Sequence, residues 1–160
     1  QLIKLSKDVN EYSHTSIGLS KDLKPMYSFA RYKWFNPFYG GFKIERLDTD
    51  VFGRNNNAKL KILEITVTKN QKEKLIAELK NMYTNRANLH YEYIGVLCAN
   101  FDIYYRSKNN YYCSDFVKTV LSNSGIINKN DFPKVTKPED FINLDNSKII
   151  YEGYVKDYHQ

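Results

Sequence analysis

Cys113 is the residue whose type and position point most directly to chemistry. It stands in Tyr111-Tyr112-Cys113-Ser114-Asp115-Phe116-Val117, and the apolar spacing that follows predicts a helix starting near the cysteine. A thiol at a helix start faces unpaired backbone N–H groups and the positive end of the helix dipole, which both favour the nucleophilic thiolate. The alternative is a small buried side chain, the usual state of a free cysteine. Cys98, within an apolar segment, fits that alternative better.

A cysteine nucleophile needs a base, and histidine is the usual one near neutral pH. The chain has three histidines. His159 is next to the last residue, and His90 lies in a polar connection. His14 stands among Ser13, Thr15 and Ser16, whose small side chains leave space around an imidazole. Elimination therefore favours His14, and a purely structural histidine in a strand is the alternative.

Two strands are expected to position His14. Residues 12–19 are rich in β-branched and aromatic residues and end at a polar Ser-Lys-Asp turn, which predicts a strand. Residues 26–31 follow Lys24-Pro25 and are predicted to form its hairpin partner. The alternation of the two strands can bring His14 and Ser28 within reach of each other.

The other elements follow from periodicity and capping residues. We predict strands at 59–68 and 147–155, a helix over 71–86 capped by Thr68, a helix from Cys113 that ends at Gly125, and a short helix over 136–141. Residues 1–10 look like the end of a short helix, and residues 93–99 like a short buried segment. Residues 32–58 look irregular, and so long a loop is usually functional or mobile.

The composition indicates one globular domain over residues 1–160, long enough to bury a core without disulfides or a structural metal. A net charge of +6 suits a polyanion such as nucleic acid, teichoic acid or an anionic membrane surface. The lysines are spread along the chain, however, which favours a solvated basic surface. No nucleic-acid-binding motif is present, so we expect no nucleic-acid partner. Neither cysteine belongs to a CxxC pair.

The sequence leaves the compartment open. No apolar stretch approaches the roughly 18 residues that a transmembrane helix needs. The chain starts at Gln1 rather than Met, which is compatible with the loss of an upstream segment such as a signal peptide. A bacterial cell surface and the cytoplasm are both compatible with these features.

Taken together, the pieces resemble the NlpC/P60 superfamily, specifically its circularly permuted, YiiX-like branch of papain-like proteins. In that branch the histidine-bearing strand comes first and the cysteine-bearing helix comes late, as in Tyr12-Ser13-His14-Thr15-Ser16-Ile17-Gly18-Leu19 and the later Cys113 segment. The resemblance includes residues 26–31, 36–42 and 136–141. It implies an α+β fold with an antiparallel sheet packed against the 71–86 helix and the Cys113 helix.

The resemblance also implies residue roles. Cys113 is expected to be the nucleophile and His14 the base of a thiol hydrolase, with no cofactor. A third residue on the next strand, often Glu, His or Gln, normally orients the imidazole. The aligned position here holds Ser28, and Tyr27 is the alternative if the register shifts by one. The Cys113 backbone N–H is expected to contribute to an oxyanion hole.

The implied reaction is thiolate attack on an amide or ester carbonyl, with cell-wall peptides as the leading substrate. The alternatives are a lipid acyltransferase or thioesterase of the same fold and, prompted by the weak third residue, a non-catalytic binding module. The aromatic segment 34–39 can wall a substrate groove or pack onto the core. We expect Tyr27, Trp34, Phe38 and Tyr112 to contact the substrate.

Overall fold

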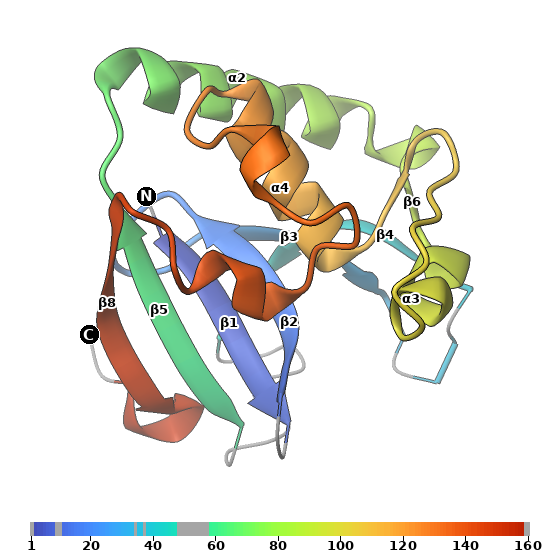
Figure 1. Ribbon diagram of the computed structural model, residues 1–160, viewed down its shortest axis with the longest axis horizontal. Helices are drawn as coiled ribbons and strands as arrows, with labels where there is room; N and C mark the ends of the chain where they lie inside the picture. Colours follow the sequence, from blue (N-terminus) through green and yellow to red (C-terminus); the bar gives the residue numbers. More distant parts are fainter. Residues whose placement is uncertain (1, 9–10, 34, 37, 48–57, 159–160) are drawn as a thin grey trace.

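A curled, mostly antiparallel sheet and the helices packed against it form an α+β structure (Figure 1). The computed structural model describes residues 2–8, 11–33, 35–36, 38–47 and 58–158. Within these residues the strands are β1 (Leu2–Asp8), β2 (Glu11–Gly18), β3 (Met26–Arg31), β4 (Gly40–Glu45), β5 (Lys59–Ile65), β6 (His90–Tyr91), β7 (Asn110–Tyr111) and β8 (Ser147–Tyr154). Their order is β7-β6-β4-β3-β2-β1-β5-β8. Neighbouring strands are antiparallel except β6 and β7, which are parallel.

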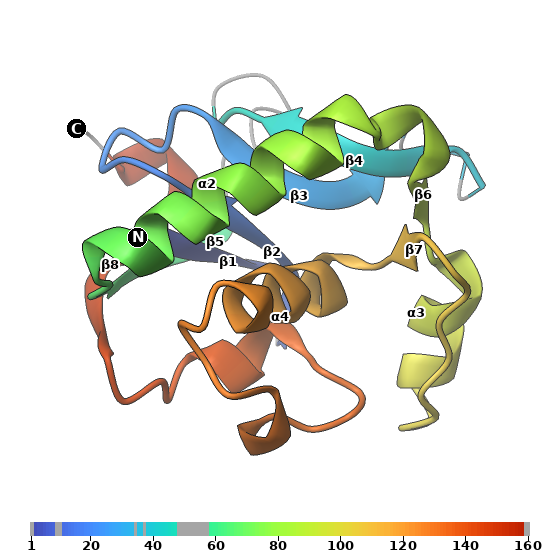
Figure 2. The ribbon, with the colours of Figure 1, turned by 90° about the horizontal axis from the view of Figure 1, so that it is seen from above.

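Helices α2 (Lys69–Thr84) and α4 (Cys113–Asn123) lie over the same face of the sheet, as Figure 2 shows. The shorter α3 (Tyr93–Ala99) lies at the end of the sheet that carries β6 and β7. Four 3-10 turns complete the described elements: η1 (Arg86–Asn88), η2 (Lys129–Asp131), η3 (Pro138–Phe141) and η4 (Val155–Asp157). Among the described residues, no helix is both long and apolar enough to cross a membrane.

The core between sheet and helices is built around three phenylalanines from three elements. Phe29 of β3, Phe42 of β4 and Phe116 of α4 are buried. Their ring centroids lie 5.2 Å apart for Phe29 and Phe116, and 5.7 Å and 5.8 Å from Phe42 to each of these. Aromatic burial of this kind contributes strongly to the stability of a core. It also fixes the first turn of α4 against β3 and β4.

Most of the predicted elements are confirmed. The structure has strands β2, β3, β5 and β8 and helices α2 and α4 at the predicted places, although β5 ends at Ile65 rather than Thr68. Thr68 caps α2 through a hydrogen bond from the backbone N–H of Gln71 (3.2 Å). Gly125 follows α4 with φ of 68°, the left-handed conformation expected at a helix C-terminus. The predicted short helix near residue 136 is the 3-10 turn η3.

The prediction of a helix end over residues 1–10 is wrong, because Leu2–Asp8 form strand β1. This strand pairs with β2 on one side and with β5 on the other. Three apolar residues within a short segment fit either a helical turn or a strand. The two rows of backbone hydrogen bonds, one from the adjacent β2 and one from the distant β5, decide the conformation here.

The irregular region predicted over 32–58 contains a further strand, β4. Its glycine pair looks like a loop signal, but the glycines allow close strand contacts. A Cβ atom on Gly40 would lie 2.6 Å from the carbonyl oxygen of Ala30, and one on Gly41 would lie 2.6 Å from that of Leu89. Gly40 and Gly41 therefore serve packing on both sides of β4.

Residues 93–99 are not a buried segment but the short helix α3, of which Gly95 is the buried residue. Ile94 and Leu97 are exposed on its surface. Cys98, expected in the core, is only partly buried. A short apolar run has the same appearance in sequence whether it faces the core or the solvent, so periodicity could not settle this point.

Candidate active site

The start of α4 meets a part of β2 that β3 leaves unpaired. Within the described part of the chain, β2 and β3 pair only at Ile17–Tyr27 and Gly18–Met26, whereas β1 pairs with β2 from Glu11 to Gly18. The N-terminus of α4 lies against this part of β2, where the backbone N–H of Thr15 donates to the Cys113 sulfur.

Cys113 is the first residue of α4, and only 7% of its surface is exposed. The helix begins here because Tyr112 is extended, with ψ of 169°, and the backbone N–H of Phe116 donates to the Tyr112 carbonyl at 2.9 Å. No side chain caps this first turn. Phe116 and Val117 are fully buried and hold the helix in place, so the thiol is fixed at its end.

The Cys113 thiol is activated by its surroundings. Burial acts to raise the pKa of this thiol, but the hydrogen bond and the charge of His14 oppose burial and win. The backbone N–H of Thr15 and the Ser114 hydroxyl, whose oxygen lies 3.8 Å from the sulfur, act in the same direction. The pKa of Cys113 is therefore lowered from its ordinary value of 9.0.

His14 bridges Cys113 and a carboxylate, Glu45. Its Nε2 atom lies 3.0 Å from each carboxylate oxygen of Glu45. Because Nε2 faces the carboxylate, Nδ1 is the ring nitrogen that can meet the Cys113 sulfur. Burial acts to lower the pKa of His14, but Glu45 and Cys113 together raise it from 6.5 to about 10. Imidazolium and thiolate are therefore the favoured pair at neutral pH.

Glu45 is the residue that sequence reasoning missed. It ends β4, two strands away from His14, and its side chain is 1% exposed. Its strand partner is Met26, on the same side of the sheet as Ser28. The resemblance implies a third residue on the strand next to His14, whereas Glu45 lies one strand further. The signal for it in the sequence is an acidic residue in the segment that follows Gly40-Gly41, a segment whose glycines look like a loop.

Ser28 lies beside His14, as the strand alternation predicted. Its hydroxyl oxygen is 3.3 Å from Nε2 of His14, within reach of the same N–H that faces Glu45. The Ser28 hydroxyl itself donates to the carbonyl of Thr15 at 3.0 Å. Ser28 is fully buried, so it fills the space between β2 and the carboxylate and helps to fix the ring.

The residues expected to bind substrate lie in different places. Tyr27 is next to Ser28 in β3, so its side chain points to the opposite face of the sheet. There its ring centroid lies 5.9 Å from that of Phe42 in the core. Tyr112 is buried directly before Cys113. Phe38 is 79% exposed and meets Tyr93 of α3 edge to face, with ring centroids 5.0 Å apart. Trp34 lies outside the described residues.

Tyr91, which the sequence did not single out, is close to the thiol. It belongs to β6, and its parallel partner is Tyr111, two residues before Cys113. Burial raises the pKa of Tyr91, and the negative charge of the Cys113 thiolate adds to this effect, whereas Arg31 opposes it. A neutral phenol near a nucleophile can donate a hydrogen bond to developing negative charge.

The other histidine candidates do not join the site. His90 is exposed on β6, and His159 lies outside the described residues. Within the described part of the chain, no group of three His, Cys, Asp or Glu side chains is placed to hold a metal ion.

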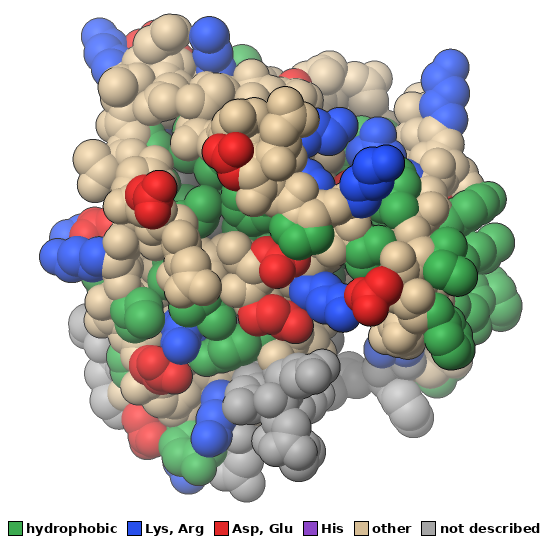
Figure 3. Space-filling view, viewed as in Figure 1, with side chains coloured by type: hydrophobic (Ala, Val, Ile, Leu, Met, Phe, Trp, Pro, Cys, Tyr) green, Lys and Arg blue, Asp and Glu red, His purple; other side chains and the backbone are tan. Residues whose placement is uncertain are grey.

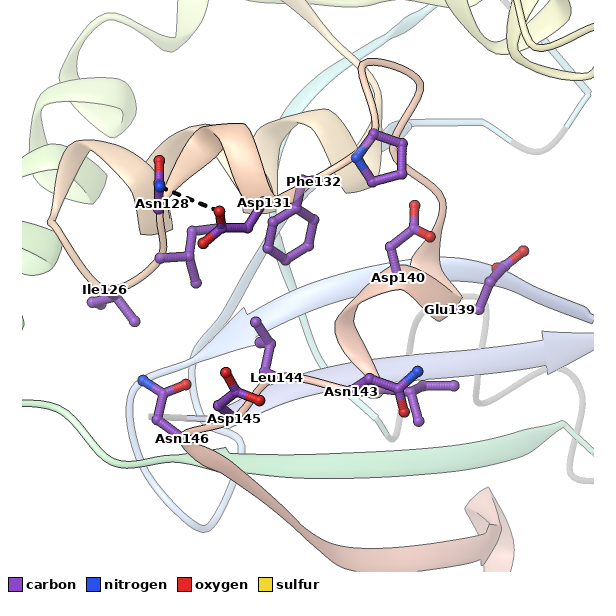
Figure 4. A pocket seen from close by; sticks show the side chains of 13 residues that line it. Ile126, Asn128, Asp131, Phe132, Glu139, Asp140, Asn143, Leu144, Asp145 and Asn146 are labelled. Atoms are coloured by element: carbon purple, nitrogen blue, oxygen red, sulfur yellow. Dashed lines mark hydrogen bonds between the residues drawn. The ribbon is translucent and has the colours of Figure 1, made fainter.

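Two further features lie outside the Cys113 site: a group of exposed hydrophobic side chains and a cavity with acidic residues in its lining. Exposed hydrophobic side chains lie together over α3 at one edge of the molecule in Figure 3. A cavity of about 690 Å³ lies between residues 126–133 and 139–146 and is drawn in Figure 4. Its lining includes Asp131, Glu139, Asp140 and Asp145, and none of the residues around Cys113.

Comparison of the chain with protein-family models, with curated proteins and with solved structures finds no significant match. The geometry itself is that of an activated cysteine: a thiol at a helix start, an imidazole in contact with it, and a buried carboxylate behind the imidazole. Such an arrangement can deliver a thiolate to a carbonyl carbon and return a proton to a leaving group.

Proposed function

We propose that the protein is a thiol hydrolase in which Cys113 is the nucleophile, His14 the general acid and base, and Glu45 the residue that orients His14. The observation that carries this proposal is the placement of His14 between the thiol and the buried carboxylate. Glu45 supplies the negative charge that the predicted third residue, Ser28, lacks.

The same observation favours catalysis over a non-catalytic binding module. A buried carboxylate costs free energy unless a paired charge compensates for it. A fold kept only for binding has no need for an imidazolium–thiolate pair beside Glu45.

We further propose that the fold is papain-like and belongs to the permuted NlpC/P60 branch. Two features support this assignment. The histidine-bearing strand β2 precedes the cysteine-bearing helix α4 in the chain, and an antiparallel sheet packs against that helix. In addition, Glu45 on β4 takes the role of the polar residue that orients the histidine in this family.

The reaction then runs through an acyl-enzyme. The Cys113 thiolate attacks the carbonyl carbon, and the electron pair of the C=O bond moves to oxygen, where the Cys113 backbone N–H can donate. The tetrahedral intermediate collapses as the His14 imidazolium gives its proton to the leaving group, which leaves a thioester on Cys113. Neutral His14 next takes a proton from water, and the water oxygen attacks the carbonyl carbon of the thioester. The C–S bond then breaks, which releases the carboxylic acid product and restores the Cys113 thiolate.

Amide bonds of cell-wall peptides are the leading substrate in this proposal. A lipid ester is the second candidate, and one observation favours it. The exposed hydrophobic side chains of α3 begin at Ile94, three residues after Tyr91, whose pKa is raised in part by the charge of Cys113. A long apolar chain could lie against that surface while its ester bond enters the site.

The test is the rate at which iodoacetamide alkylates each cysteine at neutral pH, followed by mass spectrometry of the labelled peptides. We expect Cys113 to react about tenfold faster than an ordinary thiol, and His14→Ala to abolish that advantage. Cys98→Ser is the matched control and should leave the rate at Cys113 unchanged. Equal rates at Cys98 and Cys113, insensitive to His14→Ala, would contradict an activated pair.

Products distinguish the two substrate classes. The protein is incubated with muropeptides and, separately, with phospholipids, and the products are identified by mass spectrometry. Loss of the activity in Cys113→Ala assigns it to the site. Cleavage of lipid esters with muropeptides untouched would replace the cell-wall assignment by the lipid one.

A further inference from the structure

Five exposed hydrophobic side chains belong to α3, to the turn after it and to the connection between β3 and β4, where Figure 3 shows hydrophobic side chains gathered at one edge of the molecule. We call this surface the α3 patch, and it consists of Phe38, Ile94, Leu97, Phe101 and Ile103. Each is between 47% and 79% exposed. Ile94 and Leu97 are three residues apart and lie along one side of α3, whereas Phe101 and Ile103 lie in the turn that follows this helix. Exposed apolar patches of this kind usually mark an interaction site.

The segment that carries the α3 patch is held firmly in shape. Buried Glu92 accepts hydrogen bonds from the backbone N–H groups of Gly95 (3.4 Å) and Ser107 (2.7 Å), so it ties both ends of the segment together. The backbone N–H groups of Phe101 and Ile103 both donate to the carbonyl of Cys98. The turn after α3 is thus folded back, and its hydrophobic side chains point outward although the backbone is ordered by internal bonds.

Hydrophobic side chains from a second segment continue the surface. Phe38, in the connection between β3 and β4, contacts Tyr93 of α3 with ring centroids 5.0 Å apart. Tyr104 and Tyr105 follow Ile103 and are also exposed. Aromatic side chains with a polar tip are favoured where a protein meets the boundary between lipid and water.

Charges at the border of the patch are mostly positive. Residues 31–39 and 93–108 contain four basic side chains and one acidic one, and one of the basic side chains, Arg106, is paired with Asp115 at 3.1 Å. Lys33 and Lys108 are exposed, and Lys33 lies 5.8 Å from the ring centroid of Phe35. The acidic residue, Asp102, is bound by Lys137 at 3.0 Å, which neutralises its charge. A hydrophobic centre with a basic border complements a surface that is apolar inside and negatively charged outside.

We propose that the α3 patch docks the protein on an anionic phospholipid bilayer. The hydrophobic side chains would enter the boundary of the acyl chains while Lys33 and Lys108 meet the headgroups. The charge complementarity favours this occupant over a second copy of the chain, whose patch would bring the same positive border against itself. Docking does not require catalysis, so this proposal goes beyond the proposed hydrolase activity.

The test is sedimentation with vesicles of phosphatidylcholine alone or mixed with phosphatidylglycerol, using the full chain. We expect binding to the mixed vesicles that weakens as salt is raised. The double variant F101S/I103S should bind about tenfold more weakly, because two apolar side chains no longer leave water. Ile149→Ser is the matched control: Ile149 is 47% exposed, as Leu97 is, but lies on β8, at the opposite edge of the sheet. Its binding should equal that of the wild type.

Several results would overturn the proposal. One is a wild-type protein that stays in the supernatant with both kinds of vesicle. Another is a loss of binding in Ile149→Ser as large as that in F101S/I103S. A dimer seen by light scattering that F101S/I103S abolishes, without vesicle binding, would assign the patch to a second copy.

Lys108→Glu, a surface change that spares the core, should weaken binding only to the anionic vesicles.

Alkylation of Cys113 is measured in the same variants. It should be unchanged in all of them, because none of the altered residues contacts the thiol among the described interactions. Failure of docking therefore leaves the hydrolase proposal intact, and an unreactive Cys113 leaves the docking proposal intact.

Discussion

At the scale of single residues, Glu45 gives the candidate site its electrostatic character. Ser28 can accept a hydrogen bond from His14, but it carries no charge to stabilise an imidazolium. Glu45 carries that charge and is withdrawn from solvent, so its attraction for His14 is only weakly screened. The raised pKa of His14 and the lowered pKa of Cys113 both follow from this chain of three side chains.

Glu45→Gln keeps the shape of the side chain and removes its charge. The pKa of His14 should then fall towards its ordinary value, and Cys113 should lose part of its thiolate stabilisation. We expect alkylation of Cys113 at neutral pH to slow by roughly tenfold, which corresponds to about one pKa unit. Stopped-flow or quenched alkylation with iodoacetamide measures the rate.

Glu152→Gln is the matched control for this change. Glu152 is 58% exposed on β8 and pairs with Lys61 at 3.2 Å, away from Cys113. Cys113 in this variant should be alkylated at the wild-type rate. If Glu45→Gln also kept that rate, Glu45 would be a structural partner of His14 and not the source of its charge.

At the scale of elements, α2 supports the site without taking part in it. Its buried residues Leu75, Leu79 and Met82 lie in the same core as Phe116 of α4. The Gln71 side chain donates to the carbonyl of Gly125, just after α4, at 2.6 Å. The helix that begins with Cys113 is thus held by α2 at its far end and by the sheet at its start.

Thr68→Ala removes the N-cap of α2 and should lower the free energy of unfolding by about 1 kcal/mol. The backbone N–H of Gln71 loses its acceptor, whereas the bond from the backbone N–H of residue 68 to the Gln71 side chain does not depend on the threonine hydroxyl. Urea denaturation followed by circular dichroism measures the change. Alkylation of Cys113 should be unaffected, because the cap is remote from the thiol.

Thr84→Ala, at the other end of the same helix, is the control. The Thr84 hydroxyl bonds the carbonyl of Lys80 at an exposed position and caps no N–H group. Its effect should stay within about 0.5 kcal/mol. Equal losses from both substitutions would show that threonine in α2, rather than the cap, accounts for the change.

At the scale of the whole molecule, the site links folding to pH. The folded pKa of His14 is raised, so its contribution to stability is complete below its ordinary pKa of 6.5 and is lost as pH rises through about 10. The folded pKa of Cys113 is lowered, so its contribution is complete above its ordinary pKa of 9.0 and is lost as pH falls through the lowered value. Between the two ordinary pKa values, 6.5 and 9.0, the unfolded chain carries one proton on Cys113 and the folded chain carries one on His14. Folding in this range therefore takes up no proton from water.

We therefore expect a plateau in the contribution of the pair to stability. The plateau extends up to about pH 9 and starts where pH exceeds both 6.5 and the lowered pKa of Cys113. On either side the contribution decreases. The measurement is the free energy of unfolding of the wild type minus that of the double variant H14A/C113A over this pH range. A difference that changes steadily through the neutral region would rule out the ion pair.

The sequence predicted most of the parts of this site. The apolar face of α4 depends on local spacing, and so does the start of that helix at Cys113, because helical periodicity is written in neighbouring residues. The hairpin of β2 and β3 is also local, and it brought Ser28 to His14. The sequence also predicts the roles of Thr68 and Gly125, because capping depends on one or two positions.

Tertiary structure decided the rest. Glu45 joins His14 because β4 lies beside β3 in the sheet, and that order depends on strand pairing between residues far apart in the chain. Leu2–Asp8 form a strand because β2, which follows in the chain, and the distant β5 supply hydrogen bonds on both of its sides. The exposure of α3 was likewise not readable, because an apolar run does not show which neighbours cover it.

Residues close together in the chain are enough to indicate the nucleophile candidate, the histidine and the elements that carry them. The identity of the carboxylate behind the histidine and the set of hydrophobic side chains left in solvent follow from the folded chain alone. Both depend on contacts between segments separated by tens of residues. Such contacts form only when the whole sheet closes around its core.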